Sequence, residues 1–182
     1  MDVLRKFALI AVATIAVAGL SLWCLDAFGF RSPIFAFLVN WLAMSWVAVT
    51  GRVIPYSCPP ACYDIKPFER TGQLYERLGI RLFKKLVRRG PLSIFSPTLR
   101  LPKERTLSAL QELDHEMRKA EAGHATIFML MLAFIVYALI RKWFDAALWM
   151  LAFSVIINGY PMMLQRYNRI KLQKLIQLAG GA

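Results

Sequence analysis

The chain has 182 residues, of which 58% are hydrophobic, and its mean hydropathy is +0.47. This composition excludes an ordinary soluble domain and is typical of a membrane protein. The formal net charge is +12. Because the basic residues flank apolar segments, where anionic lipid headgroups attract them, the charge indicates a membrane surface rather than nucleic acid as the partner.

Four apolar runs predict four transmembrane helices, at residues 7–25, 32–51, 125–142 and 146–164. Each run is close to the roughly 20 residues that a hydrocarbon core requires. The first run follows basic residues, as a signal peptide does, but it continues past a usual h-region, and we interpret it as an anchor. The expected fold class is therefore an all-α integral membrane protein, with residues 1–182 in a single membrane domain.

Charge asymmetry predicts the topology of these helices. All but three of the 23 basic residues fall on one side of the membrane when the four helices are threaded in order; the exceptions are Arg31, Arg141 and Lys142. The positive-inside rule then places both termini and the loop 52–124 in the cytoplasm.

The long loop contains a further helical pattern, from Phe68 to Arg89. Apolar residues recur there at steps of three, four and seven, and basic residues fill much of the rest. The apolar set is Phe68, Tyr75, Leu78, Leu82, Phe83 and Leu86. The pattern predicts a cytoplasmic amphipathic helix in the headgroup plane between the second and third spans, although Gly72 and Gly79 weaken it as a free helix.

The run from Thr106 to Ile140 contains no proline. It predicts one long helix, charged in its first half and apolar in its second. Ser108, with Gln111 three residues later, resembles a capping box at the start of this helix.

An ionisable pair, Glu121 and His124, lies where the charged half of this helix meets the apolar half. The two residues are three positions apart and are therefore neighbours on one helical face. Ionisable groups at the edge of the hydrocarbon are costly to keep there, which makes the pair a functional-site hypothesis. The alternative is that both residues merely cap the membrane end of the helix.

Polar residues also accompany the last span. Asn158, Gln165 and Arg169 are spaced by seven and four, which places them within about 20° of one stripe on a regular helix. The run Gln165-Arg166-Tyr167-Asn168-Arg169 offers two guanidiniums and two amides, suited to phosphate or carboxylate groups. The alternative is a positive-inside anchor with snorkelling arginines.

Three other polar features receive structural interpretations. Asn40, the only amide of the second span, is expected to make a helix-to-helix hydrogen bond. Asp145 is expected in a solvated turn. Cys58 and Cys62 are interpreted as ordinary thiols in a proline-rich turn, because a zinc site needs four ligands and no second pair follows.

Three separated blocks of the sequence match one known family. They are Phe68-Glu69-Arg70-Thr71-Gly72 with Phe83-Lys84, then Arg118-Lys119-Ala120-Glu121 with His124, then Asn158 with Gln165-Arg166-Tyr167-Asn168-Arg169. Over roughly residues 60–176 the chain resembles the glycosyl-4,4'-diaponeurosporenoate acyltransferase family. Members are small bacterial integral membrane proteins, and the founding activity esterifies a fatty acid onto the sugar of a carotenoid glycoside in staphyloxanthin synthesis. The resemblance implies a multi-pass protein of the bacterial cytoplasmic (inner) membrane.

The resemblance also implies an activity, for which the chemistry of the residues suggests roles. An acyltransferase would move a fatty acyl group from a thioester donor such as acyl-CoA to a hydroxyl of a lipid-linked acceptor, among membrane lipids and with no other cofactor. An alcohol attacking a thioester needs a base, for which we expect His124, with Glu121 fixing its tautomer and Glu116 completing the catalytic set. The expected substrate-binding residues, whose basic members would hold donor phosphates, are Glu69, Lys84, Lys85, Asn158, Gln165, Arg166, Asn168 and Arg169.

Two other classes of function stay open. An intramembrane metal-dependent enzyme could use Glu116, Glu121 and His124, but the two carboxylates lie about 140° apart on a helix, and we predict no metal. A non-enzymatic membrane adaptor would need only the basic interfacial helix. It gives no reason for Asn158 to lie within the last span.

Overall fold

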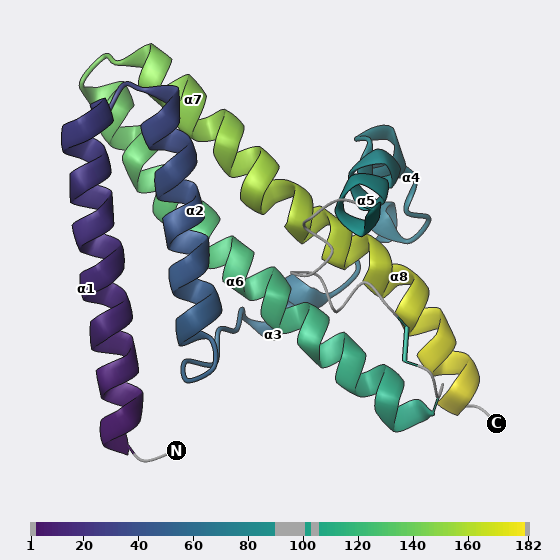
Figure 1. The fold of residues 1–182 in the computed structure, drawn as a ribbon. Helices are drawn as coiled ribbons and strands as arrows, with labels where there is room; N and C mark the ends of the chain where they lie inside the picture. The colour runs from purple at the N-terminus through teal and green to yellow at the C-terminus, as the bar shows by residue number, and fades with distance from the viewer. Residues whose placement is uncertain (1–2, 90–100, 103–105, 181–182) are drawn as a thin grey trace. The chain divides into compact units, whose positions relative to one another are not determined.

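The computed structural model describes residues 3–89, 101–102 and 106–180 (Figure 1). These residues are helical or irregular, and none of them forms a strand. The chain divides into two compact units: the first unit comprises residues 1–56 and 123–159, and the second unit comprises residues 57–122 and 160–182. The all-α fold class is confirmed, whereas the single membrane domain stays a prediction.

Four of the described helices are long and apolar enough to cross a membrane. They are α1 (Val3–Phe28), α2 (Pro33–Thr50), α6 (Leu107–Ile140) and a continuous helix, Phe144–Gly180, that contains α7 (Phe144–Ser154) and α8 (Tyr160–Gly180). The structure thus has the predicted number of membrane-length helices, and the single helix through the boundary at His124 is confirmed. Residues 107–122 of α6 belong to the second unit, and residues 123–140 to the first.

In the first unit, α1 and α2 form a hairpin (Figure 1). Gly29 turns the chain with a φ of 74°, which favours glycine. The Ser32 side chain then accepts a hydrogen bond from the Ile34 N–H, and Pro33 occupies the first turn, where its missing N–H costs nothing. Ser32 is therefore a cap outside the helix, and the predicted span 32–51 is one residue too long at each end.

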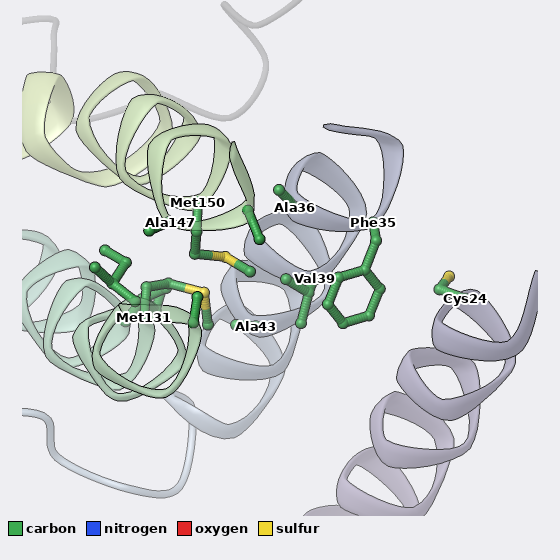
Figure 2. Close-up of a cluster of buried hydrophobic side chains, with 12 residues drawn as sticks. Cys24, Phe35, Ala36, Val39, Ala43, Met131, Ala147 and Met150 are labelled. Atoms are coloured by element: carbon green, nitrogen blue, oxygen red, sulfur yellow. The ribbon is translucent and has the colours of Figure 1, made fainter. Parts of the chain in front are cut away.

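The core of the first unit is built on close helix approach. Small residues of α2, Ala36 and Ala43, are buried against the flexible side chains of Met131 and Met150 from α6 and α7 (Figure 2). Small residues let helices come together where there is little hydrophobic drive between apolar surfaces, and methionine fills irregular gaps.

The turn between α6 and α7 closes with a Schellman pattern. The Trp143 N–H donates to the Ala138 carbonyl at 2.8 Å, and the Lys142 N–H donates to the Leu139 carbonyl at 2.9 Å. Lys142 takes the left-handed position, with a φ of 59°. The helix thus ends at Ile140, and the predicted span 125–142 includes two turn residues.

An ion pair joins the turn between α1 and α2 to the first turn of α7, and Figure 1 shows the α1–α2 and α6–α7 turns at the same end of the first unit. Arg31 donates to both carboxylate oxygens of Asp145, at 3.2 and 2.9 Å. Asp145 is exposed, as expected, and it also forms this surface ion pair, which the sequence did not predict. Both turns lie at the same end, as the predicted topology requires.

A π-helical turn, Val155–Gly159, separates α7 from α8. The stripe of Asn158, Gln165 and Arg169 was predicted with 3.6 residues per turn throughout. That calculation does not hold across the π turn, because a π turn holds more residues than an α turn.

The second unit begins with short helices rather than the predicted continuous helix from Phe68 to Arg89. They are α3 (Pro60–Tyr63), η1 (Pro67–Glu69), α4 (Gln73–Arg77) and α5 (Ile80–Arg89). Gly72 and Gly79 break the helix, since their φ angles are 73° and 80°. A Cβ at Gly72 would also lie 3.0 Å from the Tyr167 ring. The glycines therefore end helices, an effect larger than the weakening expected from their helix propensity.

The helix α5 packs against α8 and has two different faces. Ile80 and Val87 are buried, and the Phe83 ring lies 5.1 Å from the Tyr160 ring. On the other face, Leu82 and Leu86 are 64% and 62% exposed. Phe83 therefore belongs to the core of the second unit and not to the apolar face that the sequence pattern assigned to lipid.

The start of α6 differs from the predicted capping box. The helix begins at Leu107, and the Thr106 hydroxyl accepts from the Ala109 N–H at 3.3 Å. Thr106 is thus the cap, and Ser108 lies inside the first turn. Further along, Leu110 and Met117 of α6 pack on Leu172 of α8.

Candidate functional site

In the first unit a chain of hydrogen bonds, here called the amide–histidine chain, links Asn40, Ser154, Asn158 and His124. Asn40, Ser154 and Asn158 have no exposed surface. The Asn40 Oδ1 accepts from the Ser154 hydroxyl at 3.1 Å and from the Asn158 Nδ2 at 3.0 Å. The Asn158 Oδ1 in turn lies 3.3 Å from the His124 Nδ1. Asn158 and His124 are thus brought together, as both were expected in one site.

The direction of this chain is fixed at its start. The Asn40 Nδ2 donates to the Ala36 carbonyl at 2.9 Å and faces the Met150 sulfur at 3.6 Å. Rotating the amide by 180° would place its oxygen against two acceptors. The Asn40 Oδ1 must therefore accept, so the Asn158 amide donates through nitrogen and accepts through oxygen.

The histidine tautomer follows from that direction. The Asn158 Oδ1 can only accept, so the His124 Nδ1 must carry the proton. In the neutral ring the Nε2 then holds the lone pair. The amide–histidine chain thus prepares Nε2 to accept a proton from another molecule.

The local backbone suits this arrangement. Asn158 lies inside the π turn Val155–Gly159, in which the turn is wider than in an α-helix. Such turns occur frequently at functional sites. A buried amide within an apolar span is costly unless its polar atoms are paired, and here both amides are paired with each other. Asn40 does make the expected helix-to-helix hydrogen bond, but it also sets the tautomer of His124.

In the second unit two arginines and three carboxylates form what we call the arginine–carboxylate network: Glu69, Asp114, Glu121, Arg166 and Arg169. The Arg166 guanidinium pairs with Glu69 and with Glu121, each at 2.7 Å. Arg169 pairs with Glu121 at 2.9 Å and with Asp114 at 3.1 Å. Glu69, Glu121 and the two arginines come from the three sequence blocks that the family resemblance rests on.

The hydrogen bonds of Arg166 use all five of its N–H groups. Besides the two carboxylates, it donates to the carbonyls of Cys62 and Asp64 at 2.7 and 3.0 Å, and to the Tyr75 hydroxyl at 3.3 Å. A guanidinium has five N–H donors. None is left for a substrate phosphate, so these contacts indicate a structural role for Arg166.

Arg169 is wholly buried. Its third partner is the Tyr63 carbonyl, at 3.0 Å, and the guanidinium also lies 5.6 Å from the Tyr63 ring centroid. Removing one member of a buried ion pair typically costs ~3–5 kcal/mol, because the other charge is left uncompensated. The network therefore holds the segment containing α3 and η1 to α6 and α8.

The network also shifts the pKa values of its members. Burial alone would raise the pKa of Glu69, but hydrogen bonds from Arg166 and Tyr75 hold it below its usual value. Burial, together with the Glu69 charge and opposed by Arg166, raises the pKa of Tyr75 to about 12. Glu69 is therefore a carboxylate and Tyr75 a neutral phenol at neutral pH.

The expected orientation of His124 by Glu121 has no support in these contacts. Both Glu121 oxygens accept from arginines, and the His124 Nδ1 faces Asn158. Glu116 pairs with Lys119 at 2.6 Å on the surface of α6. Their assignment as catalytic residues stays a prediction. No group of three or more potential metal ligands gathers in the part of the chain that the structure describes.

Besides the two arginines, four expected substrate-binding residues lie on α5 and α8 in the second unit. The Lys84 ammonium donates to the Asn168 Oδ1 at 2.6 Å. Lys85 is exposed on the other side of α5, and Gln165 is buried. Of these, the structure brings together Lys84 and Asn168.

Sequence reasoning missed several site residues. Asn40 and Ser154 belong to the amide–histidine chain, and Asp114 belongs to the arginine–carboxylate network. Asn40 carried a signal, as the only amide of its span. Asp114 carried none, because it is one of several acidic residues in the charged half of α6.

The fold and these two clusters define an all-helical protein with membrane-length helices and a histidine oriented by a buried amide. The sequence model of one family, glycosyl-4,4'-diaponeurosporenoate acyltransferase, matches residues 59–178, well over half of the chain. The chain therefore belongs to this family, and it is an acyltransferase. No curated protein and no solved structure matches it.

Proposed function

We propose that this protein transfers a fatty acyl group from a thioester donor such as acyl-CoA to a hydroxyl of a lipid-linked, glycosylated carotenoid-like acceptor at the cytoplasmic leaflet. The family supports acyl transfer in carotenoid biosynthesis. The observation that carries the proposed chemistry is the amide–histidine chain, which leaves the His124 Nε2 as a base.

The reaction follows from general base catalysis. As the acceptor oxygen attacks the thioester carbonyl, the His124 Nε2 takes the hydroxyl proton. The Asn158 Oδ1 then accepts a hydrogen bond from Nδ1–H of the imidazolium and stabilises it, as the carboxylate does in hydrolytic triads. Collapse of the tetrahedral intermediate breaks the carbon–sulfur bond, and the imidazolium returns the proton to the departing thiolate. The products are an ester and a free thiol.

The membrane location supports the choice of substrates. Four helices are long and apolar enough to cross a bilayer, so a lipid-linked hydroxyl and a long acyl chain can approach through the hydrocarbon. The cytoplasmic leaflet follows from the positive-inside prediction and from the thioester donor, which is a cytoplasmic metabolite.

His124→Ala tests the proposal. We expect acyl transfer to fall by roughly 10²–10⁴-fold, the contribution of a positioned base. Expression should stay close to wild type, and the Tm should fall only by the cost of leaving the buried Asn158 Oδ1 without its partner. The measurement is transfer of a radiolabelled acyl group from acyl-CoA to extracted glycolipid acceptor by protein in nanodiscs.

His115→Ala is the matched control. His115 is the other histidine of the chain and is exposed on the same helix, α6, so its loss should leave transfer unchanged. Full activity of the His124→Ala protein would remove the base from the mechanism.

A further inference from the structure

A cluster of positive charge lies where α5 packs against α8, outside both networks described above. Lys84 is the basic residue on the packed side of α5, next to Phe83 and Val87, whereas Lys85 is exposed. The ammonium groups of Lys84 and Lys171 lie against the same ring, 5.9 and 4.6 Å from the Tyr167 centroid.

This cluster lacks a neutralising partner among the described residues. Lys84, Lys171 and Arg88 form no ion pair there. Glu76, whose charge interacts with Lys171, is already engaged, because it accepts from the Tyr167 hydroxyl and pairs with Arg81, both at 2.7 Å. Burial and the charges of Lys171 and Arg88 together lower the pKa of Lys84. Like charges held this close favour a bound anion.

An unpartnered donor lies in the same place. Asn168 is 8% exposed, and its Oδ1 accepts from Lys84. Its Nδ2 is buried and has no hydrogen-bond partner. A buried N–H without an acceptor is destabilising, and an anion oxygen would satisfy it. The long, flexible Lys84 side chain can turn with its charge toward an incoming anion.

We infer that Lys84, Lys171 and the Asn168 amide form a binding site for a phosphate group, with Arg88 adding to the local positive charge. Phosphate fits because it brings several acceptor oxygens and a negative charge to three N–H donors. The inference deepens the proposed function and rests on it for the role of the phosphate, which either a soluble acyl donor or a phospholipid headgroup would supply. It replaces Arg166, whose donors are already used, as the phosphate-binding residue.

Direct binding tests the site without any turnover. Inorganic pyrophosphate is titrated calorimetrically into the full-length protein in phospholipid-free detergent. We expect Lys84→Met and Asn168→Asp each to weaken binding by at least about tenfold. Lys84→Met removes a charge-assisted hydrogen bond. Asn168→Asp removes the amide donor, and its carboxylate pairs with Lys84 in place of the ligand.

Lys174→Met is the matched control. Lys174 is exposed on the same helix and is not among the charges that act on Lys84, so binding should change less than about twofold. An equal loss in Lys174→Met would show only non-specific attraction and would overturn the inference. A wild-type protein that binds neither pyrophosphate nor the phosphatidic acid probe named below would also overturn the inference.

Competition identifies the source of the phosphate. Displacement of bound pyrophosphate by adenosine 3',5'-bisphosphate and not by dihexanoyl phosphatidic acid supports a site for a soluble donor; the reverse supports a headgroup site. His124→Ala should bind pyrophosphate as the wild type does. If the wild-type protein binds pyrophosphate but transfers no acyl group, the result counts against the proposed function alone. If Lys84→Met transfers acyl groups with normal kinetics, the result counts against this inference alone.

Discussion

At His124 the hydrogen bonds decide which ring nitrogen can act as a base. The tautomer is set two hydrogen bonds away, at Asn40, whose amide Nδ2 donates to the Ala36 carbonyl. Asn40 touches no substrate in this scheme, and we regard it as a positioning residue. Its influence reaches His124 only through the orientation of Asn158.

Asn40→Leu should therefore slow the reaction without weakening substrate binding. With no acceptor at position 40, the Asn158 amide can rotate and the wrong tautomer of His124 becomes populated. We expect kcat to fall by roughly 10–100-fold, as loss of a histidine's outer partner typically does, with KM little changed. Steady-state kinetics in nanodiscs measures both constants.

Ser45→Ala provides the comparison on the same helix. The Ser45 hydroxyl donates to the Trp41 carbonyl and takes no part in the amide–histidine chain. If Asn40→Leu and Ser45→Ala have the same kcat, the orientation of Asn158 does not depend on Asn40.

Acid should weaken the second unit through Glu69. Its folded-state pKa lies below the unfolded value of 4.5, so the unfolded state takes up the proton first as the pH falls. The stabilisation is fully present above pH ~4.5 and is lost as the pH drops through the folded pKa. The Tm of the wild type should exceed that of Glu69→Gln at pH 7, and the difference should shrink below pH ~4.5. A difference that stays constant down to pH 3 would contradict this assignment.

Residues with local signals could be predicted, and residues defined by distant partners could not. His124 was found because it lies where a charged segment meets an apolar run, and Asn158 because it is an amide within an apolar run. The sequence predicted Glu121, not Asn158, as the partner of His124, since sequence spacing reports neighbours on one helix and not partners on another. Arg166 and Arg169 were found as a charged block, but the five acceptors around Arg166 come from four separate segments.

At the scale of elements, α5 has an apolar face that the unit itself does not cover. Leu82 and Leu86 lie four residues apart on α5 and are 64% and 62% exposed, and Leu78, which precedes the helix, is 47% exposed. Arg81 and Lys85 flank them. We expect α5 to lie in the headgroup plane, with these leucines in the acyl boundary and the basic residues outward.

Replacing Leu82 and Leu86 with Asn should release the segment 73–89 from the lipid surface without unfolding the unit. We expect faster proteolysis between residues 73 and 89 in vesicles, with an unchanged Tm in detergent. Ile80→Asn, at a fully buried position, should instead lower the Tm. Equal protease sensitivity of wild type and the double variant would count against an interfacial helix.

The apolar runs predicted the number of long helices but not their ends, since α1 extends from Val3 to Phe28 and the last helix continues to Gly180, beyond the predicted spans 7–25 and 146–164. Helix ends were also predicted poorly where a single backbone conformation decides. Gly79 ends α4 through its positive φ, and Lys142 ends α6 in the same region although it is not glycine. The π turn at 155–159 leaves the apolar pattern of the last span intact, so hydropathy could not reveal it.

For the whole molecule, we expect both termini and the segment 52–124 in the cytoplasm. A fluorescent protein fused after Ala182 should fluoresce, and alkaline phosphatase at the same point should be inactive. In a background without the three native cysteines, Lys142→Cys should react with an external, membrane-impermeant maleimide, and Lys174→Cys only after permeabilisation. An active phosphatase fusion would reverse the topology and with it the leaflet of the proposed reaction.

The arginine–carboxylate network has a consequence for biosynthesis. Glu69, Asp114 and Glu121 leave the ribosome well before Arg166 and Arg169, which the network needs as partners. Until α8 has been made, the three carboxylates have to stay hydrated, because they cannot be buried without those partners. The second unit can therefore assemble only late, after translation has passed the last apolar span, and a nascent chain stalled before that point would expose its acidic residues and the apolar side chains of α4 and α5 to chaperones and proteases.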